Sequence, residues 1–213
     1  MSAHRDWFRK TAWSAQHAAD FERNLARSRS QRAQYIKIQA QTLADTGKAQ
    51  LADAAIQLAH RYLKEDPRGF FETQAHLTIA KASGTKGDVS AALQAYRNAV
   101  EAEARKPGLR CCAYLEFAWF VATRGLLEAF DDVLSAMNAS QEADLIFPIA
   151  QYKYFGALAL ISNELKDREH ARRMARNALE AKARAAPFSR HKGVGVVQGI
   201  DGDIQERIRR LAA

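Results

Sequence analysis

The chain has few cysteines and no long apolar run, and both features limit its setting. The only cysteines, Cys111 and Cys112, are adjacent and therefore poorly placed to bridge each other, which predicts thiols in a reducing compartment. No apolar run approaches the ~18 residues that cross a bilayer. The first residues, MSAHRDWFRKTAW, lack the apolar core of a signal peptide. We therefore expect a cytoplasmic protein that does not enter a membrane.

Strand patterns are also scarce. The only run of alternating β-branched residues is Val194 to Val197, which is too short to found a sheet. Apolar residues make up 47% of the chain, which excludes general disorder. Four prolines, eleven glycines and abundant Ala, Leu, Arg and Gln predict an all-α fold.

Motifs for catalysis or cofactor binding are absent from the sequence. Gly193, Gly195 and Gly199 do not have the spacing of a dinucleotide-binding loop, and no Gly-Lys-Ser/Thr is present. The six histidines fall on separate segments. Cys111 and Cys112 could bind a soft metal or sense oxidants, but packing as small apolar thiols is favoured because further ligands are lacking. We expect no enzymatic activity, no cofactor and no metal.

The clearest pattern is the stretch Thr73 to Pro107, which predicts two helices joined by a turn at Gly87-Asp88. Asp88 or Ser90 can cap the second helix. Ala92, Tyr96 and Ala99 share one stripe of that helix, and the small alanines allow a neighbouring helix to approach closely.

Similar helix pairs are expected along most of the chain. Ala171, Ala175 and Ala178 repeat the stripe spacing of the central pair, and comparable points of the four pairs lie about 38 to 41 residues apart. The expected elements are an N-terminal cap at 1–31, pairs at 32–67, 72–107, 109–140 and 146–187, and a Gly-rich connector followed by a terminal helix at 188–213.

The run Gly87-Asp88, Ala92, Tyr96 and Ala99 resembles the second half of a tetratricopeptide repeat (TPR), while His76 and Ile79 depart from the usual Trp and Leu of its first half. The opening QYIKIQAQTLA also resembles bacterial helical-repeat proteins. The TPR resemblance implies a right-handed α-solenoid of about four antiparallel helix pairs. It implies that the first helix of each pair lines a concave face that binds a peptide or partner helix, with these contact residues: Gln74, Leu77, Lys81, Leu115, Trp119, Thr123, Lys153, Leu160 and Asn163.

The net charge of +8 is concentrated at the two ends of the chain, with +5 in residues 1–37, −3 in 38–165 and +6 in 166–213. One stripe of the expected last helix carries Arg168, Arg172 and Arg176, with Arg173 beside it. This stripe is either a solvated face or a contact for phosphate or an acidic protein. Two hypotheses follow: a protein-interaction adaptor or, alternatively, a nucleic-acid-associated protein. Pairing of basic ends with the acidic middle of another copy, giving a homo-oligomer, is compatible with both.

Aromatic residues gather near the N-terminus, at Trp7, Phe8 and Trp13, among basic residues. The favoured interpretation is that they pack over the open end of the helix stack, which repeat proteins have to cover. The alternative is a platform on which nucleic-acid bases stack. Ser14 is expected to cap a helix that runs to about Ser28.

Overall fold

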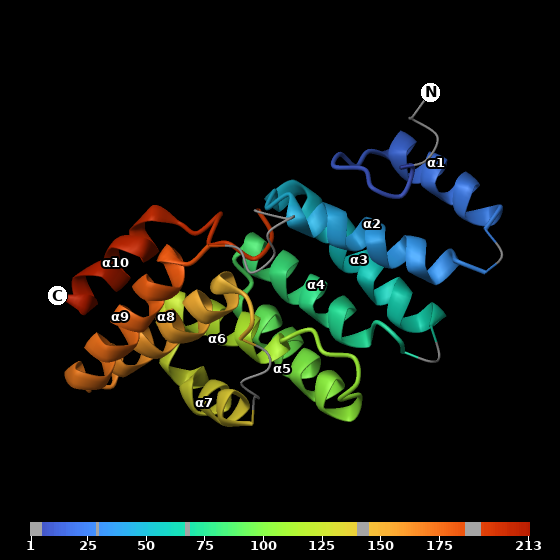
Figure 1. Cartoon of the computed structure of the whole chain (residues 1–213). Helices are drawn as coiled ribbons and strands as arrows, with labels where there is room; N and C mark the ends of the chain where they lie inside the picture. Colours follow the sequence, from blue (N-terminus) through green and yellow to red (C-terminus); the bar gives the residue numbers. More distant parts are fainter. Residues whose placement is uncertain (1–5, 29, 67–68, 140–144, 186–192) are drawn as a thin grey trace. The chain divides into compact units, whose positions relative to one another are not determined.

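The computed structural model describes residues 6–28, 30–66, 69–139, 145–185 and 193–213, and all regular structure within these ranges is helical. None of the described helices is long and apolar enough to span a membrane. The chain forms two compact units, Met1–Ala113 and Tyr114–Ala213 (Figure 1). The helices are α1 (Ala15–Ala26), α2 (Arg32–Asp45), α3 (Ala49–Glu65), α4 (Glu72–Lys86), α5 (Val89–Arg105), α6 (Ala113–Arg124), the 3₁₀ turn η1 (Leu127–Ala129), α7 (Phe130–Asn138), α8 (Pro148–Glu164), α9 (Arg168–Ala183) and α10 (Gly202–Ala212).

In the first unit, α2 packs on α3, α3 on α4 and α4 on α5, so neighbours in sequence are neighbours in space (Figure 1). The expected stripe lies in these contacts: Ala92 and Ala99 are fully buried and Tyr96 is nearly so. Contacts between first helices follow a regular spacing. Lys37 Nζ on α2 donates to Gln74 Oε1 on α4 at 3.0 Å, across 37 residues.

In the second unit, α8 packs on α9, and α10 packs on both. Ala171, Ala175 and Ala178 are buried on α9, as their spacing predicts. A first-helix contact across 37 residues recurs here, between Lys153 Nζ on α8 and Glu116 Oε1 on α6, at 2.6 Å. A contact between first helices with the same sequence separation therefore occurs in each unit.

The turns inside the helix pairs share one backbone feature, a residue in the left-handed region. Gly47, Gly87, Gly125 and Lys166 all have positive φ, and they are spaced by 40, 38 and 41 residues. Glycine reaches this left-handed region without a steric penalty, whereas a lysine there is strained. The side chain of Asp88 then accepts from Ala91 N, which confirms the predicted cap.

The structure refines the bounds of α4 and α6. Helix α4 continues through Gly84 to Lys86, so the turn is confined to Gly87. Cys112 has a φ of 54° and precedes α6, rather than lying within it, because the Glu103 carboxylate on α5 accepts from Ala113 N at 2.9 Å and holds the start of α6. This cap comes from ten residues earlier, so no local pattern indicates it.

The expected Gly-rich connector lies partly outside the described residues. Residues 186–192 lie outside the described part, but Gly195 is anchored: its carbonyl accepts from Ile149 N at 2.9 Å. A Cβ built on Gly195 would lie 2.1 Å from Phe147 Cδ1, so the segment fits closely against the start of α8. Helix α10 begins at an Asp201 cap, within the range expected for the terminal helix.

Candidate functional site

On α4, the predicted contact residues Gln74, Leu77 and Lys81 share one face but differ in availability. Gln74 and Leu77 are half-buried, and the Gln74 amide already accepts from Lys37. Lys81 is exposed, and its Nζ pairs with Asp45 Oδ1 at 2.6 Å. Because this pair is exposed it contributes little to stability, so Lys81 can exchange Asp45 for another carboxylate at small cost.

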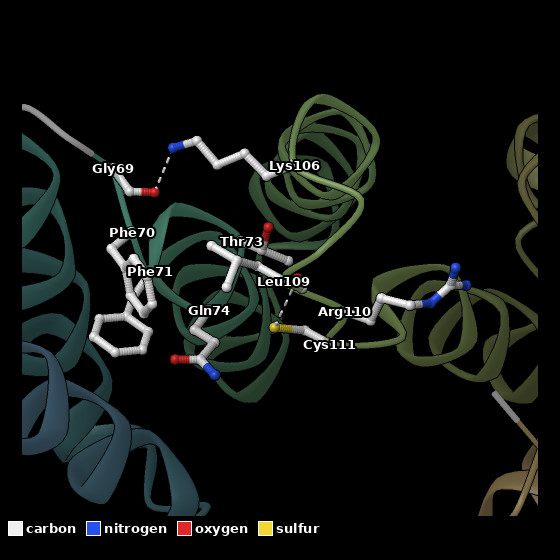
Figure 2. A pocket seen from close by; sticks show the side chains of 9 residues that line it. All are labelled: Gly69, Phe70, Phe71, Thr73, Gln74, Lys106, Leu109, Arg110 and Cys111. Atoms are coloured by element: carbon white, nitrogen blue, oxygen red, sulfur yellow. Dashed lines mark hydrogen bonds between the residues drawn. The ribbon is translucent and has the colours of Figure 1, made fainter. Parts of the chain in front are cut away.

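A small cavity opens beside Gln74 (Figure 2). It holds about 100 Å³ and is lined by Gly69, Phe70, Phe71, Thr73, Gln74, Lys106, Leu109, Arg110 and Cys111. Lys106 Nζ donates to the Gly69 carbonyl at 2.6 Å, and Arg110 points away from the other side chains. Pockets for small molecules usually have ~300–1,000 Å³, so this cavity has room for a few water molecules rather than a substrate.

A role in apolar packing predicts fully buried thiols. The two cysteines beside this cavity are instead half-buried. Burial raises the pKa of Cys111, with the Glu103 carboxylate acting in the same direction. Burial lowers the pKa of Lys37, because it disfavours the charged ammonium group. Lys37 Nζ lies over the Phe71 ring, 4.1 Å from its centroid. A raised thiol pKa disfavours the thiolate, the form that attacks electrophiles and binds soft metals.

The N-terminal aromatic residues pack against one another and against α1 and α2. The ring of Trp7 lies 5.3 Å from Phe21 and 4.9 Å from Tyr35, and Trp13 also contacts Phe21. These contacts agree with the favoured interpretation, in which the N-terminal aromatic residues cover the first helices. A cavity of about 460 Å³ opens at its edge, lined by Trp7, Lys10, His17, Asp20, Phe21, Arg23, Asn24 and Arg27.

In the second unit the structure brings together part of the predicted set. Trp119 on α6 lies 5.9 Å from the ring of Tyr152 on α8 and is half-exposed. Leu115 and Leu160 are each 3% exposed, so they belong to the core and present almost no surface to a partner in this state. Lys153 is paired with Glu116, and Asn163 is half-buried.

Helix α10 lies over the exposed part of this set. Arg207 Nη1 donates to the Thr123 carbonyl at 2.9 Å, and Ile208 is fully buried. A Cβ on Gly156 would lie 3.0 Å from Ile208 Cδ1 and 3.0 Å from Trp119 Cζ3. The missing side chain of Gly156 thus forms a notch, closed on one side by Trp119, and Ile208 fills it.

Gly156, Arg207 and Ile208 were missed by the sequence analysis. Two signals were present: a glycine inside an otherwise strong helix, which often marks close packing, and the stripe Ile204, Ile208 and Leu211 on the terminal helix. Neither signal indicates which helix meets which, because the pairing depends on the packing of α10 onto α8 and α9.

The hydroxyl of Tyr152 is a further buried group on α8. The residue is fully buried, one helical turn before Gly156, and its hydroxyl has no hydrogen-bond partner within the described ranges. Burial raises the pKa of Tyr152, and Arg209 on α10 opposes that shift. A buried polar group without a partner costs about 1–3 kcal/mol, so such groups are rare in native cores.

The predicted arginine stripe on α9 is exposed at Arg168, Arg172, Arg173 and Arg176. Arg176 Nε donates to the Ala212 carbonyl at 3.1 Å, at the C-terminal end of α10, where a cation is favoured by the helix dipole. The stripe therefore has two parts, one committed to α10 and one directed to solvent.

No group of three or more His, Cys, Asp or Glu side chains in the described ranges is placed to hold a metal ion. Comparisons of the chain with protein-family models, curated proteins and solved structures found no match.

Proposed function

We propose that the chain is a non-enzymatic interaction scaffold that binds a partner helix or extended segment along the first helices of its pairs. The observation that carries this proposal is Ile208 of α10 in the notch between Gly156 and Trp119. A surface that holds one amphipathic helix through an apolar anchor has the chemistry to hold another.

The architecture that we propose with this function is a right-handed α-solenoid of four TPR-like helix pairs in the cytoplasm. Four left-handed turn residues at near-equal spacing support the pair count. First-helix contacts across 37 residues in both units support a stepwise repeat. Cys111 and Cys112, which are both thiols, support the reducing setting.

The test is affinity purification from the native host, with the Leu77→Asp and Trp119→Ala variants beside the wild-type chain. Leu77 is half-buried on the α4 face, and its control, Leu127→Asp, changes a 60%-exposed leucine on η1. Folding of each variant is checked by circular dichroism and thermal melting. We expect both face variants to lose a partner that the wild-type chain and the control retain. Equal recovery of every partner by all four proteins would reject the surface.

One observation favours a second function, binding to nucleic acid. Arg168, Arg172 and Arg173 are exposed, and no carboxylate pairs with them in the described part of the chain. Such a stripe would neutralise phosphates and release counterions, so binding should weaken steeply between about 50 mM and 200 mM salt. Anisotropy of labelled single-stranded RNA and duplex DNA, with the triple Arg→Gln variant as a comparison, tests this function. No binding at low salt rejects it.

A further inference from the structure

Helix α10 buries few of its residues. One of its 11 residues is buried, Ile208, against eight of the 17 residues of α8. Its polar contacts lie largely at the surface: Arg176 with the Ala212 carbonyl and Lys182 with Gln205 are both exposed. Segments with few buried apolar contacts open at low free energy, while the rest of the fold stays intact.

The fit of α10 to its site rests on two specific contacts. Ile208 fills the notch at Gly156, and Arg207 Nη1 donates to the Thr123 carbonyl. Another helix with the same two groups could therefore occupy the same surface.

The attachment of α10 to the chain keeps it close when it opens. Gly195 is fixed to the start of α8 through the Ile149 N–H, and α10 begins at Gly202. The short tether holds α10 at a high local concentration beside its site. The apparent affinity of a competing helix is therefore its intrinsic affinity multiplied by the fraction of molecules in which α10 is undocked.

We propose that α10 occupies the partner-binding site of its own chain, on the α6/α8 surface. The partner is then an amphipathic helix that displaces α10 from this surface. The features of the site define this helix. It carries a branched aliphatic residue for the Gly156–Trp119 notch and an arginine directly before it for the Thr123 carbonyl. This inference rests on the proposed scaffold function and adds the class of partner and a self-blocked resting state.

The test uses the full chain and a fluorescein-labelled synthetic peptide of residues 200–213. Ile208→Gln places an amide in the apolar notch and should release α10, whereas Arg210→Gln makes a change of similar size at a residue with a 78%-exposed side chain. We expect the peptide to bind the Ile208→Gln chain at least about tenfold more tightly than the wild-type or Arg210→Gln chain, because the occupied fraction is lost. A peptide that itself carries Ile208→Gln should not bind.

Arg207→Gln provides a second route, since it removes the bond to the Thr123 carbonyl without burying a polar group. It should raise peptide affinity in the same direction by a smaller factor. Hydrogen exchange should show faster exchange in residues 202–212 of both releasing variants, with α8 unchanged. Equal peptide affinity for all chains, or no binding to any of them, would overturn the proposal.

Three further outcomes separate this inference from the alternatives. If light scattering finds a wild-type dimer that Ile208→Gln converts to monomer, α10 is exchanged between copies, and displacement by a partner is rejected. If a partner is captured in a way that depends on Leu77 but the peptide binds no variant, the scaffold stands and the role of α10 is rejected. If the peptide binds as expected but no face variant changes partner recovery, α10 opens as inferred, and the scaffold function fails.

Discussion

The side-chain amide of Gln39 forms two hydrogen bonds with the backbone of Lys10. Gln39 Oε1 accepts from Lys10 N at 2.9 Å, and Gln39 Nε2 donates to the Lys10 carbonyl at 2.7 Å. Gln39 is fully buried on α2, so one side chain fixes the aromatic N-terminal segment against the first helices.

Replacing Gln39 by leucine should therefore destabilise the fold by about 1–3 kcal/mol, because the Lys10 N–H and carbonyl lose their partly buried hydrogen bonds. Urea unfolding measures the cost, and hydrogen exchange in residues 7–13 should become faster. Gln41→Leu is the matched control, since Gln41 is exposed on the same helix. Similar costs for the two variants would show that the Lys10 contacts are dispensable.

Close helix approach gives a second prediction. Ala99 is fully buried on α5, so Ala99→Leu should cost about 1–3 kcal/mol by overpacking. Ala104→Leu on the same helix is the control, because Ala104 is exposed and leucine is a good helix former. Thermal and urea unfolding of both variants test whether the alanine stripe sets the spacing. A tolerated leucine at 99 would contradict the close approach.

Periodic features of the sequence predicted the fold well. The alanine spacing on α5 and α9, the Ser14 and Asp88 caps and the turn at Gly87 all depend on residues within one or two helical turns, and each is present in the structure. Local sequence carries such features because propensity, capping and steric limits act over short distances.

The site was predicted less well, for a physical reason. Choosing Leu115 and Leu160 as surface residues required knowing what covers α6 and α8, and both are buried. The docking of Ile208 at Gly156 joins positions 52 residues apart. The Glu103 cap of α6 likewise depends on the path of the chain between α5 and α6. Contacts between distant segments leave no periodic trace in either segment.

The turn residues predict opposite effects of opposite substitutions. Gly87 has φ +83°, so Gly87→Ala should cost about 1 kcal/mol, whereas Lys166→Gly at φ 67° should stabilise by up to about 1 kcal/mol through relief of strain. Gly108 has no positive φ and no atom within 4 Å of an added Cβ, so Gly108→Ala is the neutral control. Denaturant midpoints rank the three variants. A loss of stability in Lys166→Gly would contradict the strain.

The pKa of His76 predicts a pH dependence of stability. Burial lowers this pKa below 6.5; His60 and Arg105 act in the same direction, and Glu72 and Glu101 oppose it. Between 6.5 and the lower folded value, the unfolded chain binds more protons than the folded chain. Stability from this group is therefore fully present above pH 6.5 and is lost as pH falls through the folded value.

The variant His76→Phe removes this titration. Urea unfolding at pH steps from about 7.5 down to about 5 should show a smaller loss of stability in the variant than in the wild-type chain. Parallel curves for the two proteins would show that His76 does not contribute to the acid sensitivity.

The notch at Gly156 gives a prediction in which two general effects oppose each other. Alanine in place of glycine inside a helix normally stabilises by about 1 kcal/mol. Here the new Cβ would lie 3.0 Å from both Ile208 Cδ1 and Trp119 Cζ3, closer than side chains pack without moving. We expect the contact to prevail, so Gly156→Ala should destabilise the chain and speed hydrogen exchange in α10.

A double-mutant cycle with Ile208→Ala separates the two contacts. The shorter side chain removes one of the close approaches, so Gly156→Ala should cost less in that background, with a coupling of at least about 0.5 kcal/mol. Additive costs would mean that Trp119 alone limits the notch and that Ile208 merely lies nearby. Since Ile208 is the buried residue of α10, a change at Gly156 that moves Ile208 should weaken the docking of the whole helix, and exchange in residues 202–212 should accelerate together.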